Sequence, residues 1–177
     1  VNDAVKSVGK GRNHTETFTF ASLPTNVAEL QALPEASLDS AFKTTALTLA
    51  ALCNYEHNPD ATIEMLNFLK GPADVSGFEK QFIKEHLGSD VYKARSYFEG
   101  ATPQNSYKPD EPYKITVIEN PYSFDNADWA TLYVKSGGAD NPRQIKLRRK
   151  ASTGQWFLNE IQCLSDIRIP KEEDPWA

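Results

Sequence analysis

The sequence contains few of the residues that mark specialised small folds. Its 177 residues include two cysteines, one methionine and nine glycines. Two cysteines cannot build the disulfide framework of a small secreted domain, so we expect Cys53 and Cys163 to be buried free thiols. Free thiols favour a cytoplasmic address, while a single bridge between the two cysteines is the alternative.

Long hydrophobic runs are also missing. The most apolar stretch, Ala46–Cys53, is far shorter than the roughly 18 residues that a membrane-spanning helix needs, and it predicts a buried helix. The sequence starts at Val1 without an initiator methionine, so we expect it to be part of a longer protein.

Positive charge is in deficit. The net charge is -5, which argues against nucleic acid as a general partner because a polyanion is repelled at long range. The hydrophobic fraction of 40% and the charged fraction of 24% are typical of a folded domain. A chain of this length is expected to bury one core and not two.

The chain divides into four stretches by composition. Residues 1–17, with Gly9 and Gly11, are expected to be a flexible lead-in or linker remnant. Residues 18–177 are expected to form one α+β domain. Within it we expect a helical half over 18–100, a proline-rich connector over 101–113 and a sheet half over 114–177.

The helical half carries apolar residues at helical spacing behind recognisable capping residues. Asn26, Ser37, Asn58 and Ser76 each precede such a run, and a shorter run ends at Gly100. These signals predict about five helices. The run Phe18–Phe20 alternates and predicts a short edge strand.

The sheet half changes to a period of two. Alternating runs lie around 115–117, 131–134, 145–148 and 156–158, and turn-forming residues separate them. Hairpin connections predict an antiparallel meander of about four strands. The expected fold is therefore α+β, with an N-terminal helical layer of about five helices packed on a C-terminal sheet.

Catalytic and metal-binding patterns are absent from the sequence. It contains neither G-x-S-x-G nor S-x-x-K, and His14, His57 and His86 stand alone. Cys53 and His57 are four residues apart and would share a helix face, but no further ligands complete a zinc site. We therefore assign no catalytic, cofactor-binding or metal-binding residue.

A basic stripe is the strongest charge feature. Five cations lie within 143–150, and on a strand Lys146, Arg148 and Lys150 share the face opposite the apolar residues. The stripe is either a footprint for an anionic partner or a solvated strand face. Two expectations favour the solvated face: no exposed aromatic side chain lies nearby, and the acidic tail 172–174 neutralises the stripe within the molecule.

Three stretches together resemble a family of uncharacterised bacterial domains, a domain of unknown function. They are Tyr97–Tyr107 (YFEGATPQNSY), Ala130–Asp140 (ATLYVKSGGAD) and Arg168–Trp176 (RIPKEEDPW), the last being the end of the family's domain. The resemblance covers roughly residues 16–177. It implies a bacterial origin and a compact module attached to other segments, and it brings no activity or catalytic residue.

These observations favour a non-enzymatic binding or interaction module of a larger bacterial protein. Its partner would be another protein or an attached domain, and its oligomeric state is left open. The residues that we expect at a partner-binding surface are Lys146, Arg148, Lys150, Tyr107 and Trp176.

Two alternatives belong to other classes. The first is a small-ligand or enzymatic pocket between the helices and a curved sheet, by analogy with nuclear-transport-factor-2-like folds. It requires polar groups such as Arg95, Tyr97, Tyr133 and Trp156 to converge on one cavity. The second is weak binding of anions or nucleic acid by strand 143–150.

Overall fold

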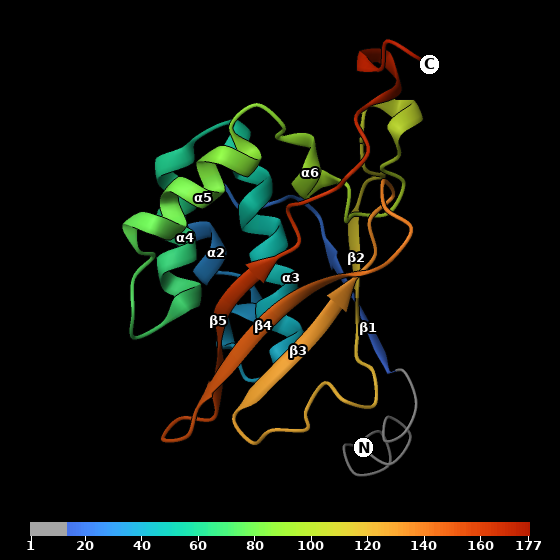
Figure 1. Cartoon of the computed structure of the whole chain (residues 1–177). Coiled ribbons are helices and arrows are strands. Elements are labelled where there is room, and N and C mark those ends of the chain that lie inside the picture. Colours follow the sequence, from blue (N-terminus) through green and yellow to red (C-terminus); the bar gives the residue numbers. More distant parts are fainter. Residues whose placement is uncertain (1–13) are drawn as a thin grey trace.

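A computed structural model describes residues 14–177 (Figure 1). The strands are β1 (Thr15–Phe20), β2 (Tyr113–Ile118), β3 (Trp129–Val134), β4 (Arg143–Lys150) and β5 (Gln155–Gln162). The α-helices are α2 (Val27–Gln31), α3 (Ala41–Leu52), α4 (Pro59–Lys70), α5 (Gly77–Leu87) and α6 (Tyr92–Arg95). Short 3-10 turns follow at Pro34–Ser37, Cys53–Glu56, Pro103–Asn105 and Lys171–Glu173.

The five strands form one antiparallel sheet in the order β1-β2-β3-β4-β5. The α+β class, the five helices and the antiparallel meander are confirmed. The expected count of about four strands is too low, because β1 pairs with β2 from Thr15↔Ile118 to Phe20↔Tyr113. Residues 15–17, which we placed in the lead-in, therefore belong to the sheet, while residues 1–13 lie outside the described residues.

Helix α3 occupies the centre of the molecule. Eleven of its twelve residues are buried, and it packs against all five strands and against α4 and α6. Its three threonines satisfy their hydroxyls locally or across the interface: Thr45 and Thr48 donate to the carbonyls four residues earlier, and Thr44 donates to the Trp156 carbonyl at 2.6 Å. That last bond, with Trp156 N–H donating to the Leu38 carbonyl, ties edge strand β5 to the helical layer.

The predicted capping residues are correct at three of four helix starts. The side chains of Asn26, Asn58 and Ser76 each accept a backbone N–H of the first turn. The prediction for Ser37 is wrong, because residues 34–37 form a 3-10 turn and Ser40 caps α3 instead. Leu38, with φ of 56°, separates the turn from that helix.

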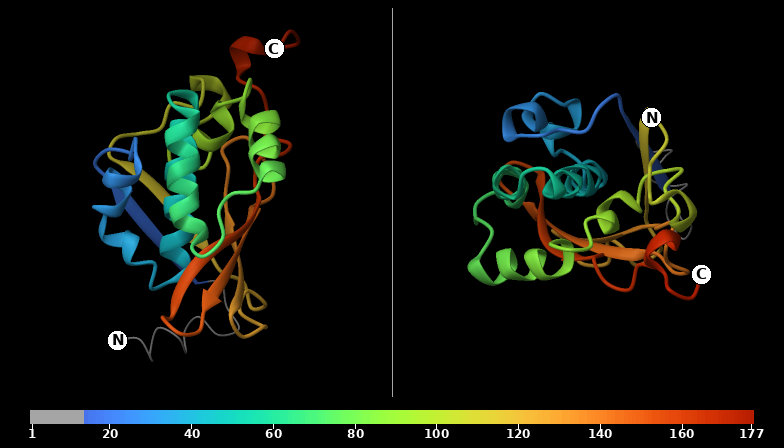
Figure 2. Two further views of the ribbon diagram at one scale, coloured as in Figure 1. Left: turned by 90° about the vertical axis from the view of Figure 1, so that its left-hand side faces the viewer. Right: turned by 90° about the horizontal axis from the view of Figure 1, so that it is seen from above.

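The helices cover one face of the sheet and leave the other face open (Figure 2). Alternate strand residues point towards the helices and are buried, among them Ile115, Val117, Leu132, Ile145 and Leu147. They join the helix residues in one hydrophobic cluster. The residues between them point to the open face, and α5 lies beside its β5 edge.

The turn after α4 brings the chain against the edge of the sheet. Gly71 ends α4 with φ of +72°, a left-handed conformation that L side chains rarely adopt. A Cβ atom at this position would lie 2.5 Å from Cδ1 of the Phe157 ring. The missing side chain of Gly71 therefore allows the turn to pack directly on Phe157.

Replacing Gly71 by alanine is expected to destabilise the fold by about 1–3 kcal/mol, because the new methyl group meets both a left-handed backbone and an aromatic ring. Urea unfolding followed by far-UV circular dichroism measures the loss. Gly77→Ala is the matched control, since nothing lies within 4 Å of a Cβ there. That control should be neutral or gain up to about 1 kcal/mol. Equal midpoints for the two variants would contradict this account of the turn.

Candidate functional site

Three side chains line up across neighbouring strands at one end of the open face. Trp129 of β3 faces Arg148 of β4, and Arg148 faces Phe157 of β5. The Arg148 guanidinium carbon lies 4.9 Å from the centroid of the Trp129 ring, within the range of a cation–π interaction. Arg148 is thus flanked by aromatic rings on both sides while remaining exposed to solvent.

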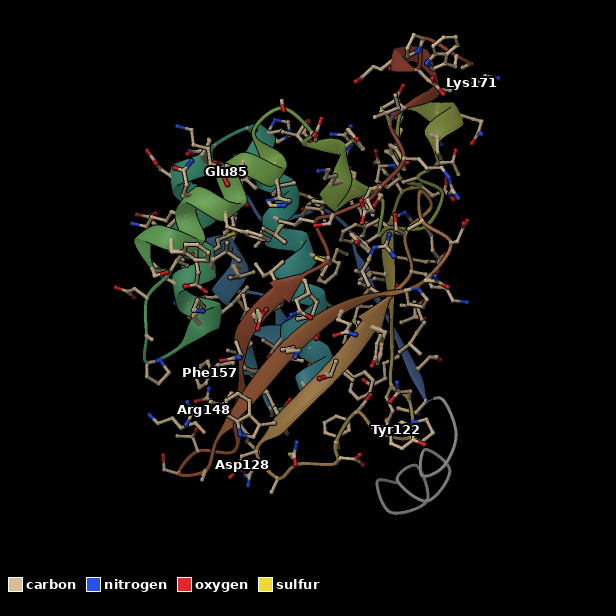
Figure 3. All side chains as sticks on the ribbon, in the orientation of Figure 1. Glu85, Tyr122, Asp128, Arg148, Phe157 and Lys171 are labelled. Carbon is tan, nitrogen blue, oxygen red and sulfur yellow. The ribbon has the colours of Figure 1, made fainter. Side chains whose placement is uncertain are left out.

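These residues border a surface hollow of about 560 Å³. The end of α4 and the turn that follows it form a second wall, which includes Lys70. The end of β4 contributes Arg149 and Lys150. We call it the Arg148 hollow (Figure 3 labels Arg148, Phe157 and Asp128 around it). Four cations and two aromatic rings therefore line a single concave surface.

Asp128 forms an ion pair with one of these cations, Arg149. Its Oδ1 atom lies 2.7 Å from the Arg149 guanidinium, and its carbonyl accepts the Arg149 N–H at 2.8 Å. The same Oδ1 atom makes no hydrogen bond of good geometry within residues 14–177. Asp128 thus pairs with Arg149, and no ion pair of the described residues joins it to Arg148.

The basic stripe gathers cations that have no ion-pair partner among residues 14–177 on one face of a single strand. Ion pairs of the described residues engage six lysines and arginines: Lys43, Lys70, Lys93, Arg95, Arg149 and Arg168. No ion pair in this part of the chain includes Lys146, Arg148 or Lys150. Other lysines of the described chain, Lys108 and Lys135 among them, are unpaired there as well, but the stripe places three such cations on the same face of one strand.

The structure brings the stripe together with aromatic residues that the sequence did not indicate. Lys146, Arg148 and Lys150 lie on the open face, as the alternation in strand 143–150 predicted. The expectation that no exposed aromatic residue lies nearby is wrong, because Trp129 is 41% exposed beside Arg148. Trp129 lies two residues before the predicted strand 131–134, so extending that strand by one alternation would have found it.

The acidic tail does not neutralise the stripe. Lys171 and Arg148 lie at opposite ends of the molecule in Figure 3. Glu172 instead accepts a hydrogen bond from the Ser106 hydroxyl, and the turns at 103–105 and 171–173 pack together. The two segments are separated because β5 ends at the far end of the sheet from the hollow.

The two aromatic candidates differ in exposure. Tyr107 is fully buried, stacks on Tyr92 at 5.1 Å and donates its hydroxyl to the Arg168 carbonyl at 2.5 Å. Its expected place on a partner-binding surface is therefore wrong, because it fixes the connector to the C-terminal segment. Trp176 is 92% exposed.

A second hollow, the α5 groove, adjoins the Arg148 hollow. It has a volume of about 330 Å³ and lies between α4, α5 and edge strand β5. Phe78 and Phe82 form its outer wall and Leu158 and Ile161 its sheet side, so its lining is mainly apolar. The two hollows share Lys70, whose ammonium group lies 2.6 Å from the Glu79 carboxylate.

The residues proposed to converge on a helix–sheet pocket lie apart. Tyr133 alternates with buried neighbours and points to the open face, whereas Tyr97 is buried and donates its hydroxyl to the Cys163 carbonyl. Arg95 forms an ion pair with Glu56, and Trp156 packs on Phe124. The space between α3 and the sheet is filled by the hydrophobic cluster.

Neither metal ligands nor a membrane helix emerge from the described residues. Cys53 and His57 line a shared surface hollow, but within residues 14–177 no group of three or more potential ligands could hold a metal ion. In the same range no helix has both the length and the apolar character to cross a membrane. Both cysteines are buried and unbridged, as expected.

The chain belongs to the family described as Domain of unknown function (DUF6935), whose profile matches residues 22–171. The match spans the helices and the sheet from β2 to β5, and it ends before the acidic residues of the tail. No curated protein and no solved structure matches the chain. The match confirms the resemblance to a domain of unknown function over residues 22–171, does not extend to the tail 172–177, and assigns no activity.

Both thiols are expected to resist alkylation in the native protein. Burial raises the pKa of the Cys163 thiol to about 12 and raises the pKa of Cys53 even more strongly. At pH 8 a thiol with a pKa near 12 is ionised in about one molecule in ten thousand, and neither sulfur is accessible. Iodoacetamide should label neither cysteine within minutes, and both after unfolding in urea. Rapid labelling of one thiol would show that its surroundings open.

Proposed function

We propose that residues 14–177 form a non-enzymatic binding module that recognises an acidic polypeptide segment in the Arg148 hollow. The observation that carries this proposal is the unneutralised basic stripe, whose Arg148 lies between Trp129 and Phe157. The three cations of the stripe share one strand face without an ion-pair partner among the described residues, and two of them, Arg148 and Lys150, line the hollow.

The chemistry of arginine fits this role. A guanidinium group stacked on an aromatic ring keeps its edge free to donate two parallel hydrogen bonds to a carboxylate. Lys146 and Lys150 lie two residues to either side on the same face, about 7 Å apart along the strand at each step. A segment with several carboxylates in extended conformation matches that spacing.

Charge favours a short acidic segment over nucleic acid. The patch is small, and the molecule as a whole carries a net charge of -5, so a long polyanion is repelled outside the hollow. A segment of a few carboxylates interacts only with the local cations. The aromatic rings do suit a nucleic-acid base, so single-stranded DNA is included as an arm of the test.

The setting of the module is part of the same proposal. We infer that it belongs to a longer bacterial protein and acts in the cytoplasm, in line with its two free thiols. Its partner is then a protein or an attached domain. An enzymatic role has less support, since the described polar groups do not converge on an enclosed cavity.

The proposal is tested with a fluorescein-labelled peptide of ten residues that alternates glutamate and glycine. We expect binding that weakens steeply with salt and that falls about tenfold in Arg148→Gln/Lys150→Gln, because two charge-assisted contacts are lost. Fluorescence anisotropy measures the affinity. Lys108→Gln/Lys135→Gln is the matched control, since both lysines are exposed and the change in net charge is the same.

Two results would contradict this function. Equal affinities of both double variants would show that the peptide responds to net charge and not to the hollow. Tighter binding of a ten-nucleotide thymidine strand than of the peptide, lost in the Arg148 variant, would replace the acidic polypeptide by single-stranded nucleic acid.

A further inference from the structure

The C-terminal segment carries the kind of ligand that the Arg148 hollow is proposed to bind. Glu172, Glu173 and Asp174 are followed two residues later by Trp176. The indole is 92% exposed, more than any other large hydrophobic side chain that the structure describes. An acidic stretch and an unburied tryptophan thus project together from the body at one end of the molecule (Figure 1).

The segment cannot reach the hollow of its own molecule. The Ser106 hydroxyl donates to Glu172, and the Arg168 N–H donates to the Gly138 carbonyl at 2.9 Å, so the base of the segment is fixed on the connector side. Lys171 and Arg148 lie at opposite ends of the molecule (Figure 3). The acidic segment and the basic hollow of one molecule are therefore too far apart to meet, whereas the segment of one copy can meet the hollow of another.

The α5 groove offers an apolar place for the indole. Its volume is about 330 Å³, and its outer wall contains Phe78, which is 81% exposed. Phe82, Ile83 and Leu158 complete the apolar lining. Burying an indole against these side chains removes exposed aromatic surface from water on both partners, and tryptophan dominates the energetics of many small interfaces.

The two hollows adjoin one another, as the acidic residues and the tryptophan do in the segment. Glu173 and Asp174 lie three and two residues before Trp176, and the Trp176 N–H donates to the Asp174 carboxylate at 2.8 Å, which keeps the tryptophan and the acidic residues close together. The α5 groove and the Arg148 hollow are adjacent and share Lys70, Leu158 and Asn159. A tryptophan in the groove therefore places the preceding carboxylates near Lys70 and Arg148.

We propose that the segment Glu172–Trp176 of one copy docks on a second copy, with Trp176 in the α5 groove and its carboxylates in the Arg148 hollow. This inference rests on the proposed function and names a second copy of this chain as the partner. A two-fold arrangement lets both segments dock reciprocally and closes the assembly as a dimer. One aromatic anchor and the carboxylates of Glu173 and Asp174 form a small interface, so the dissociation constant is expected on the order of 0.1 mM.

The test is self-association of the intact chain, measured by sedimentation velocity between about 10 µM and 1 mM, a range around that expected constant. Trp176→Ala and Phe78→Ala should each weaken the dimer at least tenfold, about the loss of one anchor residue. Both side chains are exposed, so neither variant should disturb folding. Tyr122→Ala is the matched control: its ring is 74% exposed and far from both hollows, and dimerisation should be unchanged (Figure 3).

Mixing the two variants distinguishes this specific contact from non-specific association. Trp176→Ala keeps its groove and Phe78→Ala keeps its C-terminal segment, so the mixture should recover one of the two reciprocal contacts and associate more strongly than either variant alone. A chain that stays monomeric at 1 mM, or a dimer indifferent to both substitutions, would overturn the inference. If the glutamate–glycine peptide still binds in either case, the acidic-segment function survives and the partner is another protein.

Discussion

Packing of α3 against one face of the sheet is the constraint on which the rest of the structure depends. The helix is buried on almost every side and contacts all five strands, so it fixes which alternate residues of each strand enter the core. Burial of those residues forces their neighbours onto the opposite face. A hydrogen bond supplements this apolar packing, because the Thr44 hydroxyl donates to the Trp156 carbonyl and so holds edge strand β5 against the helix.

The open face is a consequence of this one-sided packing. The α-helices that the structure describes lie on one side of the sheet or beside the β5 edge (Figure 2), and none of them covers the row Trp129, Arg148 and Phe157. Gly71 then allows the turn after α4 to close against Phe157, which deepens the corner into the Arg148 hollow. The Arg148 hollow thus forms on the face of the sheet whose side chains do not enter the core.

Much of the fold was predictable because its signals are local. Capping residues such as Asn58 and Ser76 act on the next turn of the chain, and alternation in strand 143–150 reports its own two faces. The two errors differ in origin, since one is local and the other depends on long-range strand pairing. Ser37 has the chemistry of a cap, but a turn begun by Pro34 moved the helix start to Ser40. The sequence predicted only a short strand at Phe18–Phe20 and did not count it in the sheet, because the pairing partner of β1 lies about a hundred residues away.

The candidate site was predictable in its charge and not in its surroundings. Lys146, Arg148 and Lys150 belong to one strand, so their common face followed from the period of the chain. Trp129 and Phe157 reach Arg148 only through cross-strand register, which depends on the pairing of separate hairpins. The burial of Tyr107 could not be predicted for the same reason, because its partners Tyr92 and Arg168 belong to two other segments of the chain.

The sequence by itself therefore determined the α+β class, the helix and strand faces and the family, since each depends on composition and short-range spacing. Only the tertiary structure decided which cations remain unneutralised and which aromatic side chains stand beside them. Ion pairing and stacking act over a few ångströms in space, between residues whose separation along the chain carries no information about their distance.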